Sequence, residues 1–222
     1  MRMRAATILF ATVLFSSRLE SQAELWRHKW YWGAQGGVTM FNTPTATGTQ
    51  AGTQTAVSFG GHWLITATRS ALYVAFDQIA FGGNTTSAVF DASSPNQARS
   101  VAFSSGRRIQ ALAYVIPNDK IIQLYIGGGF GISQITDAQP VGTFNTRGEQ
   151  EAVFQTIEAA GTKAFPIFSG GAQYRMGKMA LFGQYQFMPE GRSFLMTGTQ
   201  HLFQGGIRYI LTGAREEVTT ER

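Results

Sequence analysis

The sequence predicts an all-β protein, folded as a closed, eight-stranded, antiparallel, up-and-down transmembrane β-barrel. Along eight stretches, apolar and polar residues alternate with a period of two, which is typical of strands with one apolar and one polar face. Short turns and long polar connections alternate between these stretches, as expected for strands that cross a membrane up and down. Only 14% of the residues are charged. Together, these observations favour a barrel wall with lipid on one side and a polar interior on the other.

The first three stretches span residues 30–40, 57–67 and 72–81. In the first, the even positions are apolar, with tryptophan, valine and methionine among them, and most odd positions hold smaller or more polar residues. In the second, Phe59 and Trp63 share one parity, and His62 lies on the other. A two-residue turn at Arg69-Ser70 is expected to join the second stretch to the third. The period of two argues against helices in this part of the chain.

The remaining five stretches span residues 101–116, 122–132, 168–175, 181–187 and 200–211. The fourth alternates less regularly, because Leu112 and Tyr114 share the parity of Arg108. Short turns are expected at residues 117–119 and 176–177, where proline, asparagine or glycine occurs. The eight stretches therefore form four up-and-down pairs, and an even number of strands returns both ends of the chain to the same side of the membrane.

The long connections are polar and span residues 42–54, 82–100, 136–161 and 188–198. In the longest of them, Val153, Phe154 and Ile157 have helical spacing. We expect this connection to extend the adjoining strands above the membrane. A short amphipathic helix is the alternative, and an extra hairpin here would make a ten-stranded barrel.

Residues 1–23 are predicted to be a cleaved signal peptide. Arg2 and Arg4 precede an apolar run at residues 5–15, and Ser21-Gln22-Ala23 has the small residues expected before a cleavage site. The run is too short to cross a bilayer as a helix. The sequence thus divides into a signal (1–23), a barrel (24–211) and a polar periplasmic tail (212–222).

An exported soluble β-sandwich or lipocalin-like barrel would also show alternation, with its apolar face inward and lysine, glutamate and aspartate outside. Here the polar face carries mainly glycine, serine, threonine and glutamine, which favours the membrane barrel. Aromatic residues are also expected near the strand ends, where they would form interfacial girdles. They are Trp26, Trp30, Trp32, Trp63, Tyr185 and Tyr209.

The signal, residues 30–40, residues 125–132 (YIGGGFGI) and residues 200–211 (QHLFQGGIRYIL) resemble the small outer-membrane β-barrel family of OmpA/OmpX-like proteins. The resemblance implies a bacterial outer-membrane location, with both termini in the periplasm. It also implies that the last strand is the signal recognised by the outer-membrane barrel assembly machinery. Such signals usually end the chain, whereas this chain continues from Leu211 to Arg222. The recognition face would consist of Phe203, Gly205, Ile207, Tyr209 and Leu211.

Eight strands enclose room for side chains or one small ligand. With the turn at Arg69-Ser70, His62 is expected opposite Asp77, and Arg108 could pair with Asp77 from the next strand. We expect a polar network that fills the lumen, while a general base oriented by a carboxylate is the catalytic alternative. The network is predicted to contain His62, Asp77, Arg108, Arg175, Arg208, Gln110, Gln184 and Gln186.

The composition argues against several classes of function. The chain has no cysteine, its net charge of +5 is scattered, and its three histidines lack ligand spacing, so we expect no thiol chemistry, nucleic acid, metal or cofactor. None of the histidines has a serine two residues on, which argues against a lipid A deacylase. We expect a monomeric, non-enzymatic, structural or surface-interaction protein in contact with outer-membrane lipid and lipopolysaccharide. A narrow channel and a lipid A-modifying enzyme that uses His62 and Asp77 are the alternatives.

Overall fold

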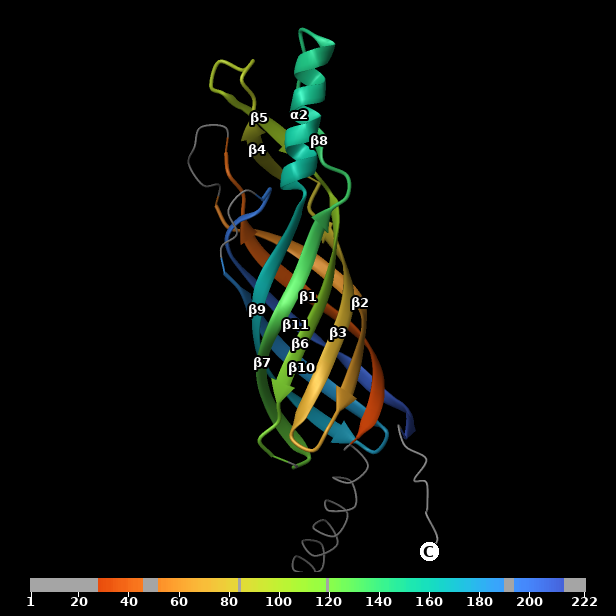
Figure 1. Cartoon of the computed structure of the whole chain (residues 1–222). Helices are drawn as coiled ribbons and strands as arrows, with labels where there is room; N and C mark the ends of the chain where they lie inside the picture. Colours follow the sequence, from red (N-terminus) through yellow and green to blue (C-terminus); the bar gives the residue numbers. More distant parts are fainter. Residues whose placement is uncertain (1–27, 46–51, 84, 119, 190–193, 214–222) are drawn as a thin grey trace, which may run out of the picture.

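The computed structural model describes residues 28–45, 52–83, 85–118, 120–189 and 194–213 (Figure 1). The expected signal peptide and Trp26 lie outside these residues. The last strand continues to Gly213, so residues 214–222 of the expected tail also lie outside them. None of the helices within the described ranges is long and apolar enough to span a membrane.

Eight strands close into one barrel in the order β1-β11-β10-β9-β7-β6-β3-β2, and every neighbouring pair is antiparallel. The predicted fold class is therefore confirmed, and the ten-stranded alternative is wrong. The ends of β1 and β11 pair at Lys29 and Gly213, at the end of the barrel where the short turns lie (Figure 1). The barrel strands are β1 (Lys29–Asn42), β2 (Gln54–Thr66), β3 (Ser70–Phe81), β6 (Ser105–Val115), β7 (Ile122–Ile135), β9 (Thr162–Met176), β10 (Met179–Met188) and β11 (Thr197–Gly213).

The outer wall of the barrel is apolar. Phe59, Ile126 and Phe130 are 57%, 67% and 72% exposed, whereas polar side chains of the same strands are buried inside. A soluble barrel would have the reverse arrangement, so that alternative is wrong for this chain. Trp32 and Trp63 pack against each other on the outside, with ring centroids 4.0 Å apart and ring planes tilted by 59°, near strand ends where aromatic residues are expected.

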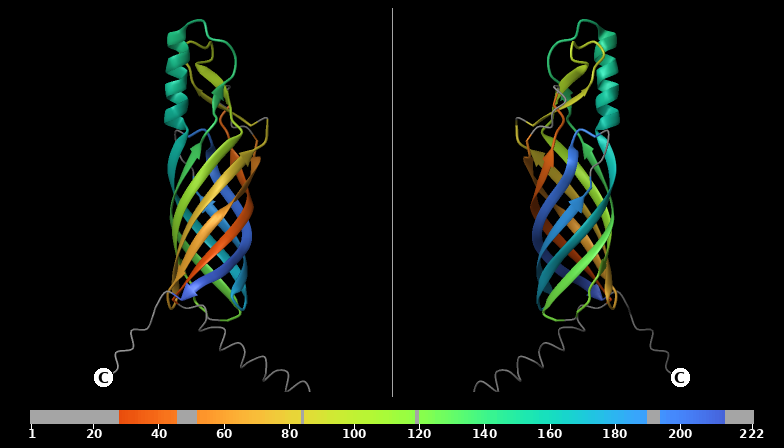
Figure 2. Two further views of the ribbon diagram at one scale, coloured as in Figure 1. Left: turned by 90° about the vertical axis from the view of Figure 1, so that its right-hand side faces the viewer. Right: turned by 90° about the vertical axis from the view of Figure 1, so that its left-hand side faces the viewer.

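A small cap stands on the other end of the barrel (Figure 2). It consists of the antiparallel sheet β4-β5-β8, with β4 (Thr86–Phe90), β5 (Ala98–Ala102) and β8 (Gln139–Pro140), and of the helix α2 (Arg147–Ala160). Val101 belongs to this sheet, so the fourth barrel strand begins at Ser105 and not at residue 101 as expected.

The helix corrects the expectation that residues 136–161 only extend the adjoining strands. Thr146 caps it, with its side chain accepting from the backbone of Glu149 while the Glu149 side chain reaches back to the backbone of Thr146. This capping box satisfies free N–H groups of the first turn, and Val153 and Ile157 bury one face of the helix. The amphipathic helix, the alternative from the sequence, is therefore the structure adopted.

Candidate functional site

The lumen is filled by side chains that point inward from all eight strands. The structure buries every residue of the expected polar network, each at most 5% exposed. Strand alternation explains this placement, because each of these residues shares its parity with the inner face of its strand. The buried side chains are those of His62, Asp77, Arg108, Gln110, Arg175, Gln184, Gln186 and Arg208.

Asp77 lies at the centre of this network and accepts hydrogen bonds from three amides. Gln35 Nε2 and Gln204 Nε2 donate to its Oδ1 at 2.6 and 3.1 Å, and Gln110 Nε2 donates to its Oδ2 at 3.3 Å. Tyr73 extends the network by donating from its hydroxyl to Gln35 Oε1 at 2.6 Å. A buried carboxylate needs such partners, and here neutral donors supply them.

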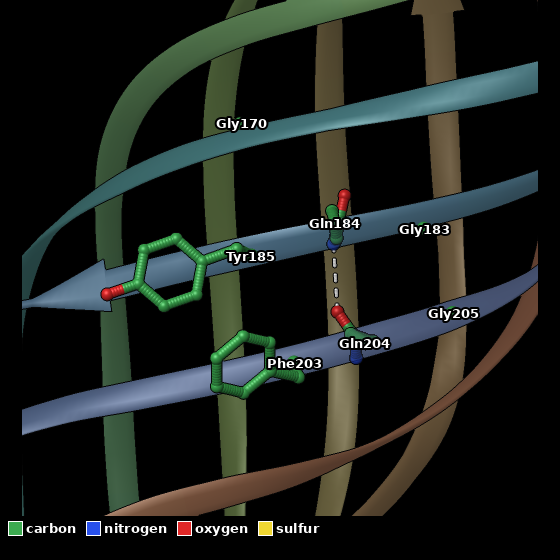
Figure 3. A pocket seen from close by; sticks show the side chains of 7 residues that line it. All are labelled: Gly170, Gly183, Gln184, Tyr185, Phe203, Gln204 and Gly205. Carbon is green, nitrogen blue, oxygen red and sulfur yellow. Dashed lines mark hydrogen bonds between the residues drawn. The ribbon is translucent and has the colours of Figure 1, made fainter.

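Gln184 connects the network to strands on the other side of the lumen. Its Nε2 donates to Gln204 Oε1 at 2.8 Å (Figure 3) and to the Tyr73 hydroxyl at 3.2 Å. Its Oε1 accepts from the hydroxyls of Tyr114 and Tyr125, both at 3.3 Å. Hydrogen bonds between tyrosine and glutamine side chains therefore connect strands across the middle of the lumen.

The expected pairing of His62 with Asp77 is wrong. The turn places Ala67 N 2.8 Å from Ser70 O, one residue earlier than expected, and this slides the register of β2 and β3 by two residues. His62 therefore pairs with Ala75, and Asp77 pairs with Gly60. A shift of two keeps both side chains inside the barrel but moves them apart along it.

His62 instead accepts a hydrogen bond from Arg208 Nε, at 3.0 Å from its Nε2. This contact assigns the ring proton to Nδ1 and leaves the histidine without an orienting carboxylate. Arg108 is the cross-strand neighbour of Asp77 but donates to Ser133 and Gln200. The catalytic arrangement considered for His62 and Asp77 is not formed.

The half of the lumen nearer the short turns is closed by Arg208. Its guanidinium lies 3.9 Å from the ring centroid of Phe182, and its Nη1 donates to Gln173 Oε1 at 2.6 Å. Gln173 in turn donates to Gln123 at 2.6 Å, and Arg175 Nη2 donates to the carbonyl of Lys120 in the turn at 2.9 Å. Stacked and hydrogen-bonded side chains thus occupy this end of the lumen.

Inward-facing glycines make room for the bulky side chains. A Cβ added to Gly33 would lie 2.2 Å from His62 Cε1 and 2.4 Å from the carbonyl oxygen of Ile207. A Cβ on Gly171 would lie 2.7 Å from the Tyr125 hydroxyl oxygen. These glycines are part of the packing of the lumen.

Gly33→Ala is therefore expected to lower the free energy of unfolding by about 1–3 kcal/mol, because the methyl group displaces His62 or the backbone of β11. Gly36→Ala is the matched control, since its Cβ would face outward with its nearest neighbour at 3.6 Å. Urea unfolding in detergent micelles measures both variants. Equal stability of the two would show that the close contact at Gly33 is not restrictive.

The mouth of the barrel beneath the cap is covered by an apolar cluster that sequence reasoning missed. The rings of Phe81 and Phe103 meet edge to face at 4.9 Å, those of Phe41 and Phe81 at 5.4 Å, and those of Phe165 and Phe194 at 5.3 Å. Phe41, Phe81 and Phe165 come from barrel strands, whereas Phe103 and Phe194 come from connections. Val153 and Ile157 of α2 belong to the same cluster, so the cap and the mouth share one core.

Ionic contacts hold the connections of the cap together. Asp91 accepts from Ser93 Oγ and from Arg99 Nε, both at 2.6 Å, and Arg99 lies 4.1 Å from the ring centroid of Phe144. The hydrogen bonds from Ser93, followed by the contact with Arg99, lower the pKa of Asp91. Partial burial raises the pKa of Asp137, but hydrogen bonds from Ser104 and Ser105 outweigh it and lower the pKa overall.

Because the pKa of Asp91 lies below its usual 3.8 in the folded cap, its contribution to stability is present above about pH 4 and is lost as the pH falls through the lowered pKa. Pepsin cleavage of the cap in wild type is therefore expected to accelerate between about pH 4 and pH 2, relative to Asp91→Asn. A constant ratio of the two cleavage rates over this range would contradict the role of Asp91.

A shallow groove of about 500 Å³ lies on the wall formed by β9, β10 and β11 (Figure 3). Gly170, Gly183 and Gly205 leave it open on the lipid-facing side, and Tyr185 and Phe203 border it. Its lining contains no aspartate, glutamate, histidine, lysine or arginine. It therefore has the character of a surface against lipid.

No family model matches the sequence, and a comparison with curated protein sequences finds no match. Among solved structures, the chain is similar to neisserial surface protein A, with 11% identity, a TM-score of 0.53, and coverage of 82% of this chain and 97% of that one. It also matches the N-terminal β-barrel domain of OprF from Pseudomonas aeruginosa, with 9% identity, a TM-score of 0.46, and coverage of 83% and 98%.

The first of these likenesses exceeds a TM-score of 0.5, and at 11% identity it shows a shared fold. The closed barrel and its apolar outer wall agree with it. The chain therefore has the fold of the small outer-membrane β-barrels, which its resemblance to the OmpA/OmpX-like proteins predicted.

Proposed function

We propose that this protein is a non-enzymatic outer-membrane β-barrel whose extracellular cap makes contacts at the cell surface. The observation that carries the proposal is the single apolar core shared by the barrel mouth and the cap. This core fixes the helix and the small sheet on the barrel, and the barrel thereby serves as an anchor for an ordered surface element.

The filled lumen argues against the channel alternative. Tyr31, Tyr73, Leu112 and Tyr114 are at most 2% exposed inside the barrel, and the aromatic cluster covers the mouth. A barrel of eight strands leaves no free path beside such side chains. In planar bilayers, we expect the protein to show no steady conductance.

The cap exposes apolar side chains that its own core does not use. Phe90 is 61% exposed, Val141 is 49% exposed and Phe154 is 36% exposed. Exposed aromatic residues on a rigid element are typical of contact surfaces. We assign surface contact to these residues, lipid and lipopolysaccharide contact to the barrel wall, and recognition by the assembly machinery to the outward face of β11.

Cells that make the wild type are to be compared with cells that make Phe90→Ser, Val141→Ser and Phe154→Ser together. The variant should retain the heat-dependent gel mobility of a folded barrel, because these side chains lie outside the shared core. Adhesion to surfaces and to other cells is expected to fall. Unchanged adhesion with a folded barrel would contradict a contact role for the cap.

Mass spectrometry of lipid A tests the enzymatic alternative directly. His62 and Asp77 are separated, and Arg208 donates a hydrogen bond to His62 Nε2. The lipid A spectra from cells with and without the protein are therefore expected to be identical. A modified lipid A species that depends on the protein would overturn the non-enzymatic assignment.

A further inference from the structure

The half of the lumen below the cap contains buried hydrogen-bond donors that have no partner. They are Thr39 Oγ1, Ser58 Oγ, Gln186 Nε2 and Arg108 Nη1, and each side chain is at most 1% exposed; Gln186 Oε1, on the same amide, is also without a partner. The four residues come from β1, β2, β10 and β6. Buried polar groups are almost always hydrogen-bonded, so four unpaired donors in one region indicate a group that they bind.

The pairing of the strands brings these donors to one level of the barrel. Leu202 on β11 pairs with Thr39 on one side and with Gln186 on the other. Ser58 pairs with Gly37, two residues from Thr39 on the same inward face. Glycine at position 37 contributes no side chain, which leaves the Ser58 hydroxyl open toward the lumen.

Arg108 reaches this group of donors from the opposite wall. Its Nη2 lies 3.3 Å from Gln200 Oε1 on β11, the strand that lies between Thr39 and Gln186. Its hydrogen bonds go to Ser133 and Gln200 and not to Asp77, its cross-strand neighbour, although the two charges lie close enough to interact. Its Nη1 is left without a hydrogen-bond partner, although the N–H groups of a buried guanidinium need acceptors.

The charge balance of the lumen favours an anion. Among the described lumen side chains that are at most 2% exposed, three are arginines and one is a carboxylate, so the lumen as a whole carries an excess of positive charge, although Arg175 and Arg208 lie in the half nearer the short turns. That carboxylate, Asp77, has its oxygens occupied by the amides of Gln35, Gln110 and Gln204. A small anion beside Arg108 would accept from the guanidinium, two hydroxyls and an amide without competing for these contacts.

We propose that the upper lumen binds a halide ion, held by Arg108, Ser58, Thr39 and Gln186. Leu202, Ile79 and Met188, all buried on neighbouring inward positions, restrict the site to an anion of small size. Chloride has the required charge and size and is abundant outside the cell. Since the apolar cluster covers the mouth, the ion enters as the barrel closes during folding, and each anion is therefore tested on protein refolded in its presence.

The site can be located by replacing chloride with bromide. The full protein is to be refolded in detergent with sodium bromide, crystallised, and measured at the bromine absorption edge. The expected result is an anomalous peak within hydrogen-bond distance of Arg108 Nη1 and Ser58 Oγ. A region without bromide, in which water bridges the four donors or Arg108 pairs directly with Asp77, would overturn the proposal.

Chloride dependence of stability gives a second measurement. The thermal midpoint is measured by the heat-dependent gel shift, with chloride replaced by gluconate at constant ionic strength, and wild type should be stabilised by chloride. Arg108→Gln should lose this dependence, whereas Arg208→Gln, a buried arginine in the other half of the lumen, should keep it. Ser58→Ala is the variant least disruptive to folding, and it should need about three- to tenfold more chloride for the same shift. Equal chloride responses of Ser58→Ala and wild type would count against the site.

Discussion

Asp77→Ala is expected to lower the free energy of unfolding by about 3–5 kcal/mol, the largest effect of any single change in the lumen. The substitution removes the acceptor of three amides, from Gln35, Gln110 and Gln204, and leaves their N–H groups buried without partners. Each unsatisfied donor costs about 1–3 kcal/mol, and local rearrangement recovers part of the sum. Equilibrium unfolding by urea in lipid vesicles or micelles measures the change.

Asp77→Asn separates the hydrogen-bonding role of this residue from its charge. The asparagine oxygen still accepts from the neighbouring amides, while its NH₂ group meets another donor, so we expect an intermediate loss of about 1–3 kcal/mol. Asp91→Asn makes the same substitution in the cap, outside the barrel. It should leave the free energy of unfolding of the barrel unchanged. An alanine variant as stable as wild type would show that the network is not needed for barrel stability.

The barrel could be predicted from the sequence because alternation is a strong signal wherever lipid faces one side of a strand. It predicts which residues lie inside, but it does not set the register between strands. The turn after β2 is one residue earlier than the sequence suggested, and this small difference separates His62 from Asp77. The turn at residues 67–70 has no glycine, proline or asparagine, and these are the residues that would have indicated the turn type.

The cap was harder to predict, although its signals are present in the sequence. Thr146 and Glu149 have the spacing of a capping box directly before the apolar positions of the helix. At the tops of the strands, the inward parity changes from polar to apolar, at Phe41, Phe81 and Phe165. That change marks the height at which the polar lumen ends and the apolar mouth begins. Contacts between Phe103, Phe194 and these rings depend on the path of two connections, and no local pattern encodes them.

Ile157→Asp is expected to detach α2 from the barrel mouth while the barrel itself stays folded. Ile157 is 5% exposed within the shared core, and a carboxylate there would be buried among apolar side chains without a partner. Val153 and Ile157 are the buried residues of the helix, and both lie in the shared core, so this apolar face is what holds the helix in place. Trypsin cleavage after Arg147, at the start of the helix, should therefore accelerate by about a hundredfold, which corresponds to about 3 kcal/mol of local stability.

Phe154→Asp is the matched control, because Phe154 lies on the same helix but is 36% exposed, so its carboxylate would reach water. Its cleavage rate after Arg147 should stay close to that of wild type, and both variants should keep the heat-dependent mobility of the folded barrel. If Ile157→Asp is cleaved no faster than Phe154→Asp, the helix is held by something other than the core it shares with the mouth. If the barrel of Ile157→Asp also loses its heat stability, the cap is required for the stability of the barrel. Barrel and cap are then not separate structural parts. Faster cleavage with an intact barrel is the result expected of a protein whose barrel holds a surface element in place.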